Sequence, residues 1–148
     1  MKDTIVIDLD GTLSNCSARR HLVTGKHRDY EAFHAKLGED PVNKWCALLM
    51  CAMEATGEYD IVIVSARPES TKEATETWLH KNHVPFAKLC LLRPDGDSTP
   101  DDALKMAWAD SYGPGRILFV VDDRQKVVDA WRAKGITCLQ CDAWKEAK

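Results

Sequence analysis

Short apolar runs alternate with helix-like segments along the whole chain. Apolar runs near 4–9, 61–64, 86–92, 117–121 and 136–139 predict five buried strands. Between them, apolar residues recur at helical spacing near 30–37, 42–56, 68–81, 100–111 and 125–133, where we expect helices. Strands that alternate with helices predict a three-layer, Rossmann-like α/β fold around a central, mainly parallel five-stranded sheet.

A long segment, residues 14–57, separates the first two predicted strands. Its first part is a basic loop that contains Arg19, Arg20, Lys26 and Arg28. We expect residues 14–57 to form a loop and a small helical insertion within a single domain, residues 1–148, because a chain of this length can bury its own core. The basic loop either faces an anionic substrate or is a solvated surface loop.

Composition narrows the function classes. The net charge is −3 and the pI is near 5.9, which argues against binding nucleic acid through bulk charge. No apolar run is long enough to span a membrane, and the N-terminus has no signal-peptide pattern, so we expect a cytoplasmic protein without a membrane partner. We expect the six cysteines to be reduced thiols, and a single Cys138-Leu-Gln-Cys141 pair does not suggest a zinc site.

Two acids end the first predicted strand. Asp8 and Asp10 are two positions apart on an extended chain, so their side chains share a face. Gly11 allows a sharp turn, and Thr12 offers a hydroxyl group to the same place. Buried carboxylates must be paired or bound to a metal, so this stretch predicts a metal-binding pair in which one oxygen can attack phosphorus. The alternative is an acidic turn after a strand.

Polar residues also follow two other predicted strands. Ser65 and Arg67 follow residues 61–64, and Asp122 and Asp123 follow residues 117–121. The carboxyl ends of parallel strands meet at one edge of the sheet, so these side chains should converge on Asp8. Four converging carboxylates need a cation, and oxygen ligands favour Mg²⁺. The alternative for Asp122 and Asp123 is a helix N-cap with a surface ion pair.

The same residues carry a family resemblance. Asp8-Leu9-Asp10-Gly11-Thr12, Ser65, Lys105 and Asp122-Asp123 resemble the four motifs of the haloacid dehalogenase (HAD) superfamily. Within it, residues 63–67, 96–105 and 121–132 resemble the 3′-phosphatase domain of phage-type polynucleotide kinase, and Arg19 falls where that domain has an active-site arginine. The GxxxxGK[ST] motif of the kinase half does not occur in this sequence.

The resemblance and the chemistry imply the same division of roles. Asp8 would form an aspartyl-phosphate, and Asp10 would move protons, which needs a raised pKa. Ser65 and Thr12 would hydrogen-bond phosphoryl oxygens, while Lys105 neutralises charge. The predicted Mg²⁺ ligands are Asp8, Asp10 (through its backbone carbonyl in the superfamily pattern), Asp122 and Asp123.

Arg19 and Arg67 are the predicted contacts for substrate phosphate. Arg124 is either such a contact or a structural partner of a motif acid. The histidines lack a metal-ligand pattern and predict surface positions, and we expect the tryptophans to pack in the core.

These residues predict a Mg²⁺-dependent phosphomonoesterase that acts on a nucleic-acid 3′ end. A nucleoside monophosphate phosphatase is the alternative. A phosphorylation-switched receiver or a non-catalytic binding module is more distant, because a receiver carries its phosphoacceptor after the third strand, where this chain has Leu91-Leu92-Arg93. The substrate is a phosphorylated nucleic-acid end or a nucleotide, and nothing in the sequence implies a protein partner.

Overall fold

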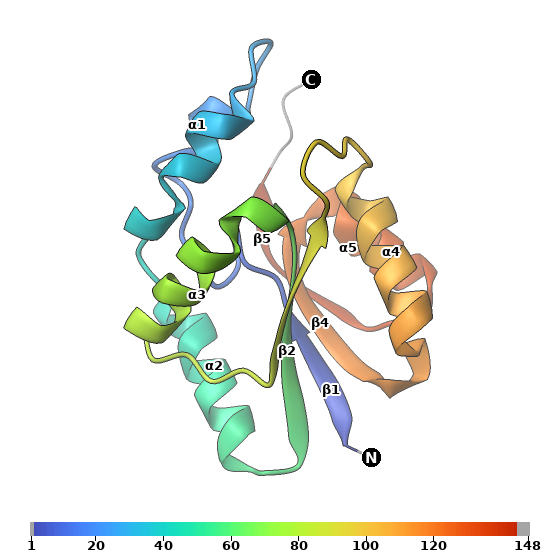
Figure 1. Cartoon of the computed structure of the whole chain (residues 1–148). Helices are drawn as coiled ribbons and strands as arrows, with labels where there is room; N and C mark the ends of the chain where they lie inside the picture. Colours follow the sequence, from blue (N-terminus) through green and yellow to red (C-terminus); the bar gives the residue numbers. More distant parts are fainter. Residues whose placement is uncertain (1, 145–148) are drawn as a thin grey trace.

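A five-stranded sheet forms the centre of the computed structural model, which describes residues 2–144 (Figure 1). The strands are β1 (Asp3–Ile7), β2 (Tyr59–Pro68), β3 (Lys88–Arg93), β4 (Ile117–Arg124) and β5 (Cys138–Trp144). Their order is β3-β2-β1-β4-β5, and all four pairings are parallel. The predicted α/β fold with a parallel five-stranded sheet is therefore confirmed.

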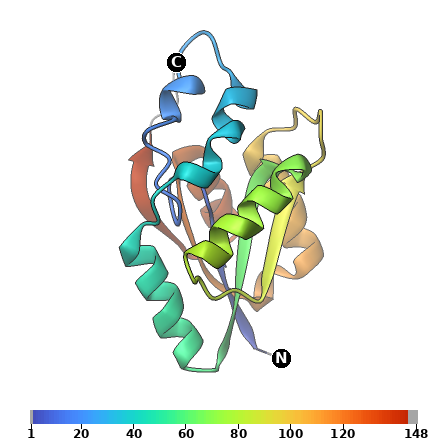
Figure 2. The same ribbon diagram turned by 60° about the vertical axis from the view of Figure 1, so that its left-hand side comes forward.

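Helices cover both faces of this sheet. They are α1 (Tyr30–Ala35), α2 (Lys44–Ala55), α3 (Lys72–Lys81), α4 (Asp101–Tyr112) and α5 (Gln125–Ala133). Short 3-10 turns lie at Arg20–Leu22, Leu37–Glu39, Glu69–Thr71 and Pro114–Arg116. Figures 1 and 2 show α2 and α3 on one face and α4 and α5 on the other, so the fold has three layers.

The alternating side chains of β1 join the two cores. Ile5 and Ile7 pack with Met50 of α2 and Trp78 of α3. Val6 faces the other way and packs with Trp131 of α5. Because β1 is central and buried on both faces, the residues that directly follow it are held firmly at the carboxyl edge of the sheet.

Two segments extend beyond that edge. The first segment belongs to the predicted insertion, residues 14–57. Helix α2 of this insertion covers the sheet, and residues 14–43, which we call the cap, extend past the strand ends (Figure 1). Phe33 anchors α1 through its buried ring, and the Asp29 side chain accepts a hydrogen bond from the Ala32 N–H to cap that helix. The second segment is the loop 94–100 between β3 and α4. These two segments enclose the space above the strand ends.

Several element boundaries differ from the sequence prediction. Strands β2 and β4 continue through Arg67 and Asp123, because after an irregular register Pro68 still pairs with Arg93 of β3 and Arg124 with Trp144 of β5. Pro68 ends β2 in extended conformation, so α3 begins only at Lys72. Trp45 is 46% exposed, so the prediction of core packing is wrong for this tryptophan. Within residues 2–144, every helix is too short or too polar to cross a membrane.

Candidate active site

Asp8 lies at the centre of the site, directly after β1. Its N–H donates to the Val121 carbonyl of β4 (3.1 Å), which fixes the backbone between the two strands. The buried Thr12 hydroxyl donates to Asp8 Oδ2 (3.2 Å). Gly11 has a φ of +85°, and a Cβ there would lie 1.9 Å from Asp123 Oδ2, so only glycine fits this turn. Thr12 thus contacts Asp8 and does not line the cavity described below.

Lys105 joins two of the carboxylates. Its Nζ donates to Asp8 Oδ1 and to Asp122 Oδ2, each at 2.8 Å, and all three side chains are buried. Burial alone would lower the pKa of Lys105, but Asp122 and Asp8 raise it above its usual value, so the amine stays charged. Burial and the Asp122 carboxylate raise the pKa of Asp8 above its usual value.

Asp123 completes a cluster of three carboxylates. Oxygens of Asp8, Asp122 and Asp123 lie within 4.8 Å of one another. Asp123 Oδ2 is buried and has no hydrogen-bond partner among the residues that the structure describes. Burial and the two neighbouring carboxylates raise the pKa of Asp123. Three hard oxygen donors with one compensating lysine fit a divalent cation such as Mg²⁺. The Asp10 carboxylate is outside this cluster.

Two arginines hold Asp10. Arg67 donates to its carboxylate from Nη2 (2.7 Å) and Nε (3.1 Å), and Arg19 forms an ion pair with it through Nη2. Burial would raise the pKa of Asp10, but Arg67 and Arg19 hold it well below its usual range. The predicted raised pKa of Asp10 is therefore wrong. The cause is that two guanidinium groups outweigh the desolvation of one carboxylate.

Arg19 lies behind Asp10. Its side chain is buried and donates to both carboxylate oxygens of Asp40, with Nε to Oδ1 at 2.9 Å and Nη2 to Oδ2 at 2.6 Å. It also donates to the Phe33 carbonyl (3.1 Å) and stacks on the Phe33 ring. Arg19 does not line the cavity. This position differs from the predicted phosphate contact because Asp10 and Asp40 already occupy the guanidinium group.

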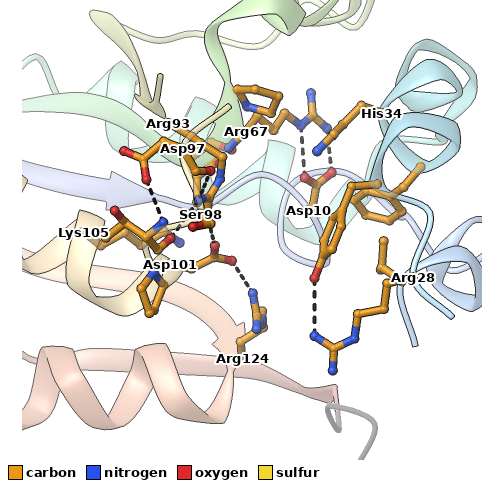
Figure 3. Close-up of a pocket in the computed structure, with 18 of the residues that line it drawn as sticks. Asp10, Arg28, His34, Arg67, Arg93, Asp97, Ser98, Asp101, Lys105 and Arg124 are labelled. Atoms are coloured by element: carbon orange, nitrogen blue, oxygen red, sulfur yellow. Dashed lines mark hydrogen bonds and ion pairs between the residues drawn. The ribbon is translucent and has the colours of Figure 1, made fainter. Parts of the chain in front are cut away.

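A cavity of about 770 Å³ opens above these residues. Its floor contains Asp8, Asp10, Ser65, Arg67 and Lys105, so the structure brings together five of the predicted site residues. The cap forms one side through Arg28, Tyr30 and His34, and the opposite side includes Arg93, Asp97, Asp101 and Arg124 (Figure 3). The floor and the two sides come from segments far apart in the sequence.

The wall opposite the cap is held together by Arg93. Its guanidinium donates to the carbonyls of Ala66 (3.0 Å), Asp97 (3.0 Å) and Thr99 (2.7 Å) and forms an ion pair with Asp101. Arg124 also pairs with Asp101. Arg124 thus both lines the cavity and pairs with an acid of α4, while Arg93 fixes the loop 94–100.

Sequence reasoning missed several of these residues. Asp40 holds Arg19, and Tyr30 and His34 line the cavity from the cap. The sequence predicts surface or loop positions for the histidines, whereas His34 lies on α1, half-buried beside Phe33, and burial lowers its pKa. The four-residue spacing of Tyr30 and His34 puts them on one side of α1, a signal that could have indicated a shared surface.

The fold and this site define the class of protein. Three carboxylates at the carboxyl ends of parallel strands, with a lysine of α4 that contacts two of them, define a phosphatase of the HAD superfamily. A family model described as the polynucleotide kinase PNKP phosphatase domain matches residues 2–144. The chain belongs to this family.

Solved structures agree with this assignment. The chain is 26% identical to a chain of the Pnkp1/Rnl/Hen1 RNA repair complex, with a TM-score of 0.76, covering 95% of this chain and 43% of that one. A second Pnkp1/Rnl/Hen1 complex gives 26% identity and a TM-score of 0.79, covering 99% of this chain and 47% of the other. This chain therefore spans less than half the length of both. CbbY from Rhodobacter sphaeroides in complex with phosphate shares the fold at 14% identity (TM-score 0.63; 97% of this chain, 88% of CbbY).

Proposed function

We propose that this protein is a Mg²⁺-dependent phosphomonoesterase that removes the 3′-phosphate from nucleic-acid ends through an aspartyl-phosphate on Asp8. The observation that carries the proposal is the position of the Asp8 carboxylate. It lies on the floor of an open cavity, with one oxygen bound by Lys105 and the other by Thr12, beside two further carboxylates. This arrangement places a charge-compensated carboxylate where a bound phosphoryl group can reach it.

In the first step, an Asp8 oxygen forms a bond to phosphorus while the bond from phosphorus to the 3′-oxygen breaks. The leaving oxygen takes a proton from the Asp10 carboxyl group, and the free 3′-hydroxyl departs. Arg67 keeps Asp10 ionised in the resting site. A phosphate dianion bound next to Asp10 adds negative charge, which raises the pKa of this carboxyl group and allows it to carry a proton.

In the second step, a water oxygen bonds to phosphorus while the bond between phosphorus and Asp8 breaks. Asp10 accepts the water proton and is thereby ready for its next role as an acid. Lys105 stays charged throughout because two carboxylates contact it. Ser65 and Arg67 lie on the cavity floor, where they would bind the phosphoryl oxygens.

Asp8, Asp122 and Asp123 are the side chains that would hold Mg²⁺, with the Asp10 backbone carbonyl as the proposed further ligand. The cation supplies charge neutralisation for the transferring phosphoryl group. Asp123 Oδ2 supports this assignment, because it accepts no hydrogen bond from the residues that the structure describes and Arg20 Nη2 approaches it only to 3.9 Å, and a buried carboxylate oxygen without a hydrogen-bond donor is costly in a metal-free site.

Four observations support a nucleic-acid end as the substrate. The chain belongs to the PNKP phosphatase family, and two similar chains are parts of Pnkp1/Rnl/Hen1 complexes, one of which is named as an RNA repair complex. The cavity is much larger than a phosphate group, and Arg28, Arg124 and Lys126 line it. A nucleoside monophosphate remains the second candidate, because the same cavity and charges suit it.

The test compares phosphate release from a 3′-phosphorylated RNA or DNA oligonucleotide with release from free nucleoside 3′- and 5′-monophosphates. A higher kcat/KM for the oligonucleotides is expected. A preference for mononucleotides would favour the nucleotidase, and release that survives chelation of Mg²⁺ would contradict the metal assignment. The variant Ser65→Ala, which removes a proposed phosphate contact at the floor, should weaken activity on every phosphomonoester.

A further inference from the structure

The cap wall of the cavity carries an aromatic side chain that the fold does not use. Tyr30, the first residue of α1, lines the cavity and is 52% exposed. The residue of this helix that packs in the interior is Phe33, which is buried and stacks under the Arg19 guanidinium. A large aromatic ring that packs in no core and borders a reaction site suits contact with a planar ligand.

A cation lies beside this ring. Arg28 lines the same cavity, and its Nη1 donates to the Tyr30 hydroxyl (3.4 Å). Arg28 forms no ion pair with any residue between 2 and 144. In Figure 3, Arg28 and His34 lie on the same side as Asp10, and Lys105 lies on the other side. The cap thus presents an aromatic ring and a guanidinium group, hydrogen-bonded to each other, on the side away from Lys105.

The cavity is large enough to hold more of the substrate than its phosphoryl group. Its volume of about 770 Å³ lies in the range of sites that enclose a whole organic ligand. A phosphoryl group on the floor, at Asp8, occupies only a small part of it. The remaining space, bordered by Tyr30 and Arg28, must receive whatever the phosphate is attached to.

We propose that Tyr30 and Arg28 form the subsite for the end of a polynucleotide: Tyr30 stacks on the base of the nucleoside that carries the 3′-phosphate, and Arg28 binds the adjoining phosphodiester. This inference rests on the proposed function. Stacking accepts any base, so the subsite selects for a polymer end without reading its sequence. A mononucleotide would use the Tyr30 contact and would not use the Arg28 contact.

The first experiment measures KM of the full chain on three probes. They are a 3′-phosphorylated oligonucleotide, the same oligonucleotide with an abasic 3′-terminal sugar phosphate, and glycerol 2-phosphate. Tyr30→Ala should raise KM for the first probe by roughly 5- to 100-fold, the usual loss for one base stack. The same variant should leave KM for the other two probes unchanged. Tyr30→Phe should behave like the wild type, because it keeps the ring.

Trp45→Ala is the matched control, since Trp45 is 46% exposed and does not line the cavity. This variant should leave KM for all three probes unchanged. An unchanged KM of Tyr30→Ala on the base-containing probe would overturn the stacking role, and so would an equal loss on all three probes. If the wild type hydrolyses glycerol 2-phosphate but neither oligonucleotide, the proposed function is contradicted. This outcome is seen in the wild type, so it can be told apart from failure of the stacking role, which is seen only in Tyr30→Ala.

The second experiment tests Arg28 by salt dependence. Each phosphate contact to a single strand contributes about 0.7 to the slope of log(kcat/KM) against log[salt]. Arg28→Ala should reduce that slope by about this amount on the oligonucleotide and leave it unchanged on a nucleoside 3′-monophosphate. Lys26→Ala removes an exposed cation of the same loop that does not line the cavity, and it serves as the control. Equal slopes for Arg28→Ala and the wild type would overturn the phosphodiester contact.

Discussion

The catalytic floor and the cap wall of the same cavity are built in opposite ways. Asp8 and Lys105 of the floor and the adjoining Asp122 are buried, and Lys105 compensates both carboxylates at 2.8 Å. On the cap wall, Tyr30 and Arg28 are exposed, and the fold does not require them. A change on the floor should therefore affect both chemistry and stability, whereas a change on the wall should affect the choice of substrate alone.

The two regions also differ in how they are joined to the fold. On the floor, Asp8 directly follows β1 and its N–H is bonded to β4, while Ser65 and Arg67 lie within β2, so the sheet fixes their backbone. A buried chain of contacts, from Asp40 to Arg19 to Asp10, connects the cap to the floor. A point substitution in this chain therefore tests how far the cap affects the floor.

The largest effect is expected from Asp8→Asn. An amide cannot form the aspartyl-phosphate, so phosphate release should fall by roughly 10⁴- to 10⁶-fold. Lys105 keeps Asp122 as a partner, and the variant should remain folded. A phosphate-release assay and a thermal melt measure both quantities. Full activity in Asp8→Asn would contradict the assignment of the nucleophile.

Lys105→Met should be the most destabilising change on the floor. It leaves buried carboxylates without their cation, which should lower the free energy of unfolding by about 3–5 kcal/mol in urea denaturation without Mg²⁺. Lys134→Met is the control, because Lys134 pairs with the exposed Asp110 at the surface and should contribute less than about 1 kcal/mol. Equal losses in both variants would mean that Lys105 does not compensate the cluster.

The contrast between the two regions also explains how far the sequence could predict them. Asp8, Asp122 and Asp123 follow buried apolar runs, and the parallel topology brings all strand ends to one edge. The local sequence pattern was therefore sufficient to predict that these acids converge. The low pKa of Asp10 depends on arginines 9 and 57 residues away. The burial of Arg19 depends on Asp40, 21 residues away, through a fold of the cap that has no regular periodicity.

The same reasoning applies to the cap wall. Tyr30 begins a six-residue helix, too short for a hydrophobic stripe to indicate which side is buried. Arg28 was one of several cations in a basic loop, and the sequence could not separate it from Arg20, which pairs with Asp123 and Asp142. Only tertiary contacts divide these arginines into a structural group and a ligand-facing group.

Mg²⁺ should stabilise the floor. A ligand at about 100 times its Kd adds about 2.7 kcal/mol to the free energy of unfolding, so the melting temperature should rise with added Mg²⁺ and fall on chelation. Asp123→Asn should remove most of this rise, since it replaces a carboxylate of the cluster whose Oδ2 accepts no hydrogen bond from the residues that the structure describes. Asp110→Asn, an exposed surface change, should retain it. A wild-type melting temperature that does not respond to Mg²⁺ would argue against the metal site.

Asp40→Asn tests the connection between the two regions. It removes the charge that orients Arg19, so Asp10 should lose one of the two arginines that fix its position, and kcat should fall by roughly 10- to 100-fold. KM should stay unchanged, because Asp40 does not line the cavity. Steady-state kinetics on the 3′-phosphorylated oligonucleotide separates the two constants. A rise in KM with unchanged kcat would instead assign Asp40 to substrate binding.

The smallest expected effect is the dependence of the free energy of unfolding on pH that His34 of the cap causes. Burial lowers the pKa of His34 below its usual value of about 6.5, so the folded protein keeps the ring neutral where the unfolded chain begins to bind a proton. The free energy of unfolding should therefore fall as pH drops below about 6.5 and be unaffected above it. His34→Gln should show a smaller fall than the wild type in urea denaturation with Mg²⁺ present. His21→Gln, an exposed cap residue, should match the wild type, and identical curves for all three proteins would remove His34 as a source of acid sensitivity in the cap.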